Sequence, residues 1–172
     1  MTENTNSKFP SEADVVIVGV GGIVGSMIAY WLSELGQKNI VGLEKSSVIP
    51  SDIASTAHAS DFVYNTTHDK LGCWTTAYSR KFYEDNGFFL KKGGLEICRK
   101  GDDARWEELK RKVGSGKAFG TNVRLISAAE AKEKFPLLDE ESLMGAMWDP
   151  DAGLVIPRSQ DVVSFAVESA RD

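Results

Sequence analysis

A strand-like apolar run that ends in a cluster of glycines constrains this chain more than any other feature. Residues 15–18 read VVIV, and glycines follow at positions 19, 21, 22 and 25. Apolar residues then recur at helical spacing as far as Gly36, and a second apolar stretch ends in Glu44. The helical set is Ile23, Val24, Met27, Ile28, Trp31, Leu32 and Leu35. This order predicts a strand buried on both faces, a glycine turn, an amphipathic helix and a second, parallel strand.

The same layout is typical of a site for the ADP part of a dinucleotide. A pyrophosphate binds to free backbone N–H groups at the positive end of a helix, and glycine lets the main chain approach it closely. An acid about 20 residues after the glycines accepts hydrogen bonds from the adenosine ribose, and Glu44 has this position. Because a carboxylate there repels a 2′-phosphate, the sequence favours FAD or NAD over NADP.

The glycine spacing leaves two registers open. Counted from Gly19 the run is G-x-G-x-x-x-G, and counted back from Gly25 it places Val20 where the first glycine belongs. We expect one extra residue in the turn, with Gly22 and Gly25 at the helix start and Gly19 at the strand end, where substitution by alanine would be milder than a substitution of Gly25. In the alternative register Gly19 makes the tight turn itself, and positive φ would make its substitution severe.

Composition excludes several classes of protein. With 42% hydrophobic and 26% charged residues, the chain of 172 residues is globular. No apolar run reaches the length of about 20 residues that spans a bilayer, so we expect no membrane partner. The net charge of −5 without a basic stripe argues against nucleic acid. Two isolated cysteines and no histidine cluster predict no metal site. Residues 1–12 lack targeting signals, which predicts a disordered lead-in to a cytoplasmic protein.

A long loop of small and hydroxylated residues follows Glu44 and carries His58. NAD enzymes generally continue at this point into another crossover helix, whereas such a loop suggests backbone that lies along an extended ligand. The loop therefore favours FAD, and an NAD-binding dehydrogenase domain remains the alternative.

At this loop the chain resembles the dimethylglycine and sarcosine dehydrogenase group of the D-amino-acid oxidase superfamily. The matching segments are GIVG at 22–25, EK at 44–45, STAHA at 55–59, GGLE at 93–96, FPLL at 135–138 and DAG at 151–153. In that family the histidine of the third segment is joined covalently to the 8α-methyl group of FAD, and the resemblance implies this role for His58. Ala54 and Ser60 stand where the family usually has glycine.

The order of elements and the resemblance together predict the architecture. We expect an α/β fold in which a Rossmann-like FAD-binding βαβ unit is interrupted by a strand-rich substrate-domain insertion and is truncated at the C-terminus. The expected ranges are a lead-in at 1–12, an FAD-binding region at 13–86, the insertion at 87–156 and a return to the FAD-binding domain at 157–172. Within them we expect a helix over 69–84 with Leu71, Trp74, Tyr78 and Phe82 inward, a hairpin over 88–98, and a capping box at Ser127 and Glu130.

The resemblance also implies the function. It indicates the N-terminal portion of an FAD-dependent oxidoreductase that oxidises the C–N bond of a small amine, of the dimethylglycine or sarcosine type, by hydride transfer to flavin. The expected cofactor-binding residues are Gly19, Gly22, Ile23, Val24, Gly25, Glu44, Lys45, Ser55, Thr56, Ala57, His58 and Ala59. No residue stands out as a catalytic base or carboxylate clamp, and the electron acceptor is unassigned. Besides the NAD-binding domain, a non-catalytic flavin-binding fragment is the other alternative.

Overall fold

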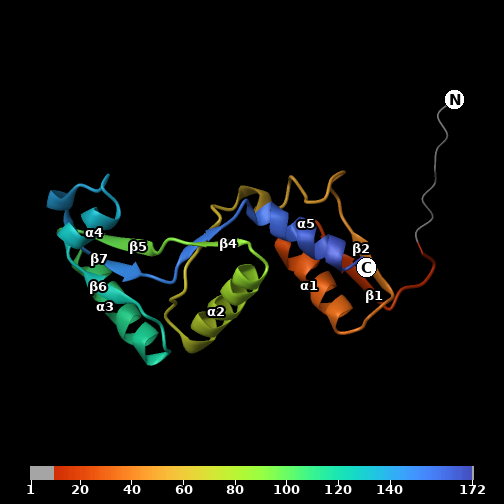
Figure 1. Cartoon of the computed structure of the whole chain (residues 1–172), viewed down its shortest axis with the longest axis horizontal. Helices are drawn as coiled ribbons and strands as arrows, with labels where there is room; N and C mark the ends of the chain where they lie inside the picture. The colour runs from red at the N-terminus through yellow and green to blue at the C-terminus, as the bar shows by residue number, and fades with distance from the viewer. Residues whose placement is uncertain (1–9, 172) are drawn as a thin grey trace. The chain divides into compact units, whose positions relative to one another are not determined.

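The computed structural model describes residues 10–171 (Figure 1). It forms two compact units, of which the first holds the chain as far as Ser60 and again from Pro157, and the second spans Asp61–Ile156. Residues 1–9 of the expected lead-in lie outside the described part. Residues 61–86, which the sequence assigns to the FAD-binding region, belong to the second unit, and their share in cofactor binding stays a prediction.

The first unit is a βαβ arrangement. Strand β1 (Val15–Val18) pairs in parallel with β2 (Ile40–Leu43), and α1 (Ile23–Glu34) connects them. Helix α5 (Ser159–Ser169) lies beside α1, as Figure 1 shows. A 3-10 turn, η1 (Ser55–His58), follows the loop after β2. The α/β class and the βαβ start predicted from the sequence are confirmed.

The core of this unit lies on one side of the sheet. It contains Ile17, Val20, Ala29, Val163 and Val167. Side chains alternate along a strand, and those of Val16 and Val18 on the other face are 54% and 83% exposed. The expectation that β1 is buried on both faces is therefore wrong for the described residues.

Helix α1 buries only part of the predicted apolar stripe, of which Ile23 and Leu32 pack against the core. Its buried residues are Gly25, Ser26 and Ala29, whereas Val24 and Leu35 of the predicted apolar stripe are 71% and 83% exposed. Small residues face inward because the helix lies close to the sheet and to α5. The hydrophobic period identified the helix but only part of its buried face.

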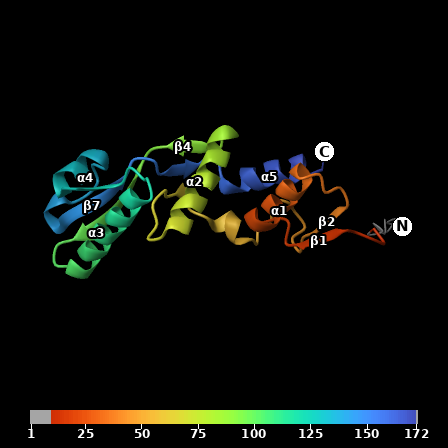
Figure 2. The ribbon, with the colours of Figure 1, turned by 90° about the horizontal axis from the view of Figure 1, so that it is seen from below.

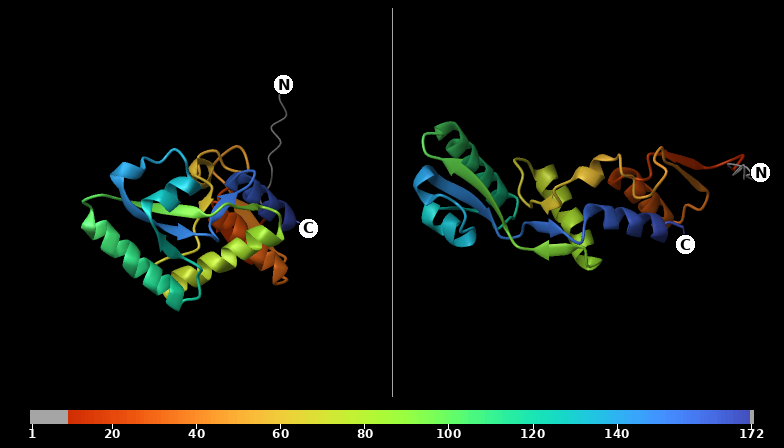
Figure 3. Two further views of the ribbon diagram at one scale, coloured as in Figure 1. Left: turned by 60° about the vertical axis from the view of Figure 1, so that its left-hand side comes forward. Right: turned by 90° about the horizontal axis from the view of Figure 1, so that it is seen from above.

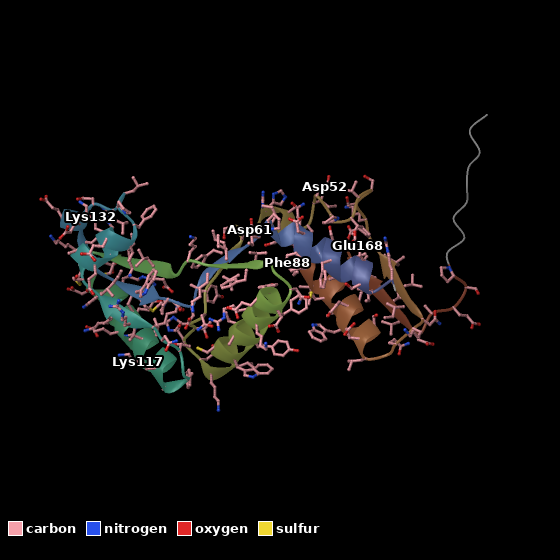
Figure 4. The ribbon with its side chains drawn as sticks, in the orientation of Figure 1. Asp52, Asp61, Phe88, Lys117, Lys132 and Glu168 are labelled. Carbon is pink, nitrogen blue, oxygen red and sulfur yellow. The ribbon has the colours of Figure 1, made fainter. Side chains whose placement is uncertain are left out.

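The second unit contains two three-stranded antiparallel sheets. One has the order β5 (Gly94–Arg99), β7 (Leu143–Asp149), β6 (Arg124–Ile126), and the other has the order β3 (Phe62–Val63), β8 (Gly153–Val155), β4 (Phe89–Lys91). In the second sheet, Val155 donates a backbone hydrogen bond to Asp61 O and Ile156 donates one to Phe88 O; Figure 4 labels both acceptor residues.

The predicted hairpin over 88–98 is wrong. Strand β4 pairs with β8 and β5 pairs with β7, so the two strands belong to different sheets. Gly93, between them, donates its N–H to Ala152 O at 2.8 Å instead of closing a local turn. Strands β7 and β8, which are joined by a turn, thus pair with β5 and β4 on either side of Gly93.

Helices cover both faces of the β5-β7-β6 sheet. In Figures 2 and 3, α3 (Asp103–Ala118) and α4 (Ala128–Lys134) lie on opposite sides of β7. The core under α3 contains Cys98, Leu109, Val113, Val123 and Met147. A capping box at Ser127 and Glu130 begins α4 as predicted. A 3-10 turn, η2 (Glu140–Ser142), precedes β7.

Helix α2 (Lys70–Asp85) presents aromatic side chains to solvent. Phe82 is buried as predicted, but Leu71, Trp74 and Tyr78 are 68%, 61% and 53% exposed. The rings of Trp74 and Tyr78 stack with their centroids 5.6 Å apart. The expected core stripe is therefore wrong at three of its four positions.

No helix in the described range is long and apolar enough to cross a bilayer.

Candidate functional site

The turn between β1 and α1 begins at Gly19. Its φ is +90°, a conformation that side chains rarely adopt, and its N–H donates to Leu43 O at 2.7 Å. Gly19 therefore makes the tight turn itself. The expectation that Gly19 does not make the turn is wrong, and its positive φ agrees with the alternative register, in which substitution by alanine is severe.

Gly25 allows α1 to lie against the end of β1. A Cβ atom built on Gly25 would be 2.2 Å from the carbonyl oxygen of Gly19. This neighbour is backbone and cannot move as a flexible side chain could. Gly25 is thus required for packing between helix and strand, while Gly22 is the N-cap residue of α1.

Val20 follows Gly19 in the turn, and a glycine on β2 leaves room for its side chain. A Cβ atom on Gly42 would be 3.0 Å from Val20 Cγ1 and 3.2 Å from Val20 Cβ. Val20 is buried. The side chain of Val20 is therefore accommodated by the absence of a side chain on the neighbouring strand.

This pair predicts a coupling that a double-mutant cycle can measure. Gly42→Val alone overpacks the contact and Val20→Gly alone leaves a void, so each is expected to lower the free energy of unfolding by about 1–3 kcal/mol. In the double variant the valine and the glycine exchange positions, so the contact is filled again from the other strand. Its loss of unfolding free energy should be about 1 kcal/mol smaller than the sum of the two single losses. Urea unfolding of the four proteins gives the cycle, and additivity within about 0.5 kcal/mol would show that the pair is not coupled.

Gly21 completes the turn, although it is not among the residues predicted to bind the cofactor. Its N–H donates to Glu44 Oε2 at 2.8 Å, and Ser51 N–H donates to Gly21 O at 2.9 Å. A Cβ on Gly21 would be 2.6 Å from Glu44 Oε2 and 2.7 Å from Ser51 Cβ. The G-x-G spacing that begins at Gly19 includes Gly21 and could have identified it as part of the turn.

The Glu44 carboxylate lies at the end of β2, against the glycine turn. Its Oε1 accepts hydrogen bonds from the N–H groups of Lys45 and Ser46, both at 2.9 Å. The Ser46 N–H, followed by the Gly21 N–H, holds the pKa of Glu44 below its ordinary value. Glu44 is therefore a charged acceptor at neutral pH, and its Oε2 has a lone pair left for a ligand hydroxyl.

A buried hydroxyl group lies beside this carboxylate. Ser51 is 1% exposed, and its Oγ has no partner with hydrogen-bond geometry. Its proximity still contributes a little to the lowered pKa of Glu44. A buried polar atom without a partner requires an explanation, and a ligand hydroxyl at Glu44 would supply one. Sequence reasoning missed Ser51, because its burial depends on the fold of the loop.

The loop after β2 returns to the start of α1. Gly22 provides no side-chain cap, and Thr56 Oγ1, from η1, instead accepts the N–H of Ile23 at 3.0 Å. His58 ends η1 with an exposed side chain. This contact across 33 positions fixes the loop that carries His58 against the helix N-terminus.

The structure thus brings many of the predicted cofactor residues together where β1 and β2 end. Gly19, Gly22, Ile23, Gly25, Glu44 and Thr56 form the turn, the helix start and their direct contacts. Lys45, Ser55, His58 and Ala59 have exposed side chains in the adjoining loop, Val24 is exposed on α1, and Ala57 is half-buried in η1. Within residues 10–171 no three His, Cys, Asp or Glu side chains gather as a metal site would require.

The residues present fit an ADP-containing cofactor. The first turn of α1 has no acidic side chain. The N–H of Ile23 is bonded to Thr56 Oγ1, and the N–H groups that follow it and the helix dipole remain available to a pyrophosphate. Gly21 lets the charged Glu44 and the unpartnered Ser51 lie directly against the turn, where a Cβ would collide with both. Chemically, the arrangement can bind a diphosphate at the helix and a ribose at the acid.

Comparison with known proteins gives the family. The family described as FAD dependent oxidoreductase (DAO) matches residues 14–163. The chain belongs to this family. Its cofactor class is therefore FAD, and the resemblance stated from the sequence is confirmed.

Relatives of this FAD-dependent oxidoreductase chain include enzymes for N-methylated amino acids. It is 27% identical to mitochondrial sarcosine dehydrogenase of Homo sapiens, over 99% of the chain and 19% of that protein. It is 27% identical to human mitochondrial dimethylglycine dehydrogenase, over 91% of the chain and 18% of that protein. It is also 31% identical to the mitochondrial pyruvate dehydrogenase phosphatase regulatory subunit of Mus musculus, over 94% of the chain and 18% of that protein. The chain thus spans a small part of each relative.

Solved structures agree with the fold. L-proline dehydrogenase from P. horikoshii superposes with a TM-score of 0.82 at 27% identity, over 95% of this chain and 42% of that chain. Glycine oxidase from Bacillus cereus superposes with a TM-score of 0.73 at 26% identity, over 92% and 44%. Both cover nearly all of this chain, so the fold class predicted from the sequence is confirmed.

Proposed function

We propose that this chain is the FAD-binding part of an oxidoreductase that oxidises the C–N bond of an N-methylated amino acid, of the dimethylglycine or sarcosine type. The observation that carries the proposal is the meeting of Glu44, Gly21 and the start of α1 at one point. The substrate class rests on relatives, which also include a 4-methylaminobutanoate oxidase of Paenarthrobacter nicotinovorans at 28% identity. All three enzymes are named for amino acids that carry methyl groups on nitrogen.

In this proposal each part of the turn has one task. The N–H groups at the start of α1 bind the pyrophosphate, and Glu44 accepts hydrogen bonds from the adenosine ribose. When bound, FAD supplies the acceptor for the hydride equivalent that leaves the carbon next to the amine nitrogen. The chain contributes the binding and orientation of the cofactor, and no residue of it is assigned as a catalytic base.

We also propose that His58 forms the covalent bond to FAD that the resemblance implies. Its exposed imidazole is accessible, and the Thr56 contact with Ile23 holds the same short turn beside the predicted pyrophosphate position. His58 would hold the flavin through a neutral imidazole nitrogen, which is a nucleophile. The 8α-methyl group would lose a proton from one C–H bond as the C–N bond forms, and the two electrons would pass to the flavin ring and from it to an oxidant such as O2.

Removing the charge of Glu44 is expected to weaken cofactor binding. Glu44→Gln keeps the size of the side chain but loses charge-assisted hydrogen bonds of about 1.5–3 kcal/mol, which corresponds to an FAD affinity lower by about tenfold or more. The measurement is a fluorescence titration with FAD in a His58→Ala background, since a covalent bond would hide the loss.

Glu34, at the last position of α1, provides the matched control. Glu34→Gln removes the same charge at the opposite end of the helix and should leave FAD affinity unchanged. An unchanged affinity in Glu44→Gln, or an equal loss in both variants, would show that Glu44 does not bind the ribose.

Anaerobic reduction of the bound flavin tests the substrate class without knowledge of the electron acceptor. Dimethylglycine or sarcosine is expected to bleach the flavin absorbance, whereas glycine, which lacks the N-methyl group, should do so at least about tenfold more slowly. Reduction by glycine or proline but not by the N-methylated amino acids would contradict the proposed substrate.

A non-catalytic role is the second candidate, and the 31% identity to the phosphatase regulatory subunit favours it. In that case the protein would hold FAD, and no amine would reduce it. The NAD-binding alternative is no longer supported, because the matched family is described by FAD. A cytoplasmic location stays a prediction.

A further inference from the structure

A second hollow lies in the other unit, away from the glycine turn in the chain. It has a volume of about 620 Å³ and is walled by side chains of β5, β7 and α4 and the loop after α4. Its apolar wall includes Leu95, Phe135, Leu138 and Trp148. Pockets of about 300–1,000 Å³ with mostly apolar walls and a few polar groups are typical small-molecule sites.

The Trp148 ring is held in place from two directions. Gly93 has φ +78°, and a Cβ on it would be 1.9 Å from Trp148 Cη2, so only a bare backbone fits against the ring. The Lys134 ammonium lies 4.3 Å from the ring centroid, within range of a cation–π interaction. Trp148 also packs on the small core of Ile126, Ala131 and Ala146. The wall is therefore preformed.

The charged residues that line this hollow are both cations. They are Lys92 and Lys134, and no Asp or Glu lines it. No ion pair joins either lysine to a carboxylate of the described residues, whereas nearby Lys91 pairs with Asp151 and Lys112 with Glu96. An apolar pocket that has only positive charge at its walls attracts an apolar anion.

We propose that this hollow binds an organic monocarboxylate with an aromatic or branched aliphatic body. The carboxylate would lie at Lys92 and Lys134, and the body would pack on Trp148 and the neighbouring leucines. Inorganic phosphate would leave the apolar wall unfilled, and a neutral hydrocarbon would give neither ammonium group an anionic partner. The charge and the wall together select a molecule that has both parts. This inference does not depend on flavin binding.

The test compares two probes that differ only in charge. Isothermal calorimetry of the purified protein with 2-naphthylacetate and with 2-naphthylacetamide should show the acid binding at least about tenfold more tightly. A Lys92→Gln/Lys134→Gln double variant should lose this preference. Lys132→Gln, on the same helix and labelled in Figure 4, should keep it, because Lys132 does not line the hollow.

The salt dependence of the affinity is a second test. Raising the salt concentration from about 50 to about 500 mM should weaken binding of the acid but not of the amide. Equal affinity of the two probes, no binding of the acid, or an unchanged preference in the double variant would overturn the proposal. Far-UV circular dichroism of the double variant, which should match that of the parent protein, shows that the fold is kept. A preference lost equally in Lys132→Gln would also overturn it.

Discussion

Replacing Gly25 by alanine is expected to abolish FAD binding. The added Cβ would lie 2.2 Å from Gly19 O and 2.8 Å from Gly19 C, which is far shorter than a van der Waals contact. The backbone of Gly19 cannot easily move away, because its N–H is hydrogen-bonded to Leu43 O. Helix α1 must therefore move away from β1, and its N–H groups leave the pyrophosphate position. The measurement is flavin absorbance per protein after purification, together with the free energy of unfolding, which we expect to fall by about 3 kcal/mol or more.

Gly114 on α3 gives a matched control for this change. It is an exposed helical glycine with no atom within 4 Å of its would-be Cβ. Gly114→Ala should keep the flavin and raise the free energy of unfolding by about 0.5–1 kcal/mol, because alanine favours the helix. A Gly25→Ala protein that retains FAD as well as Gly114→Ala does would contradict the role of Gly25 in helix packing.

The second large effect is expected at His58. If its imidazole carries the flavin, the His58→Ala protein should show no flavin fluorescence on a denaturing gel, while the native variant still binds added FAD. The variant should lose the covalent bond to the flavin but keep the non-covalent FAD site, because Glu44, Gly21 and the start of α1 are unchanged.

His68, the other histidine of the chain, is the control for that experiment. Its Nε2 lies 3.4 Å from Glu108 in the second unit, and His68→Ala should keep the fluorescent band. Complete release of the flavin from the parent protein by acid would refute the covalent bond and leave non-covalent FAD binding intact.

Local patterns in the sequence predicted the βαβ start and its acid, since strand, turn and helix are each encoded by neighbouring residues. The role of Gly21 was missed because it depends on Ser51, which returns to the turn from the loop after β2. The spacing of glycines also did not reveal which one has positive φ, so the role of Gly19 was misassigned.

Choices that depend on distant partners were harder to predict. Strand β4 follows β3 in the chain but pairs with β8, which lies some 60 residues later, and no local signal marks that partner. Likewise the buried face of α1 is set by α5, which packs on Ala29 through Val163 and Val167. The apolar stripe alone therefore indicated a helix but only part of the side that it buries.

The central claim is that the glycine turn and Glu44 bind the ADP half of FAD, and competition between ligands tests it most directly. Cofactor-free His58→Ala protein would be titrated with FAD in the presence of ADP or of its 2′-phosphorylated analogue. We predict that ADP displaces FAD, whereas the analogue competes at least about tenfold more weakly, because its phosphate meets the Glu44 carboxylate. Failure of ADP to compete, or equal competition by the two nucleotides, would contradict the account.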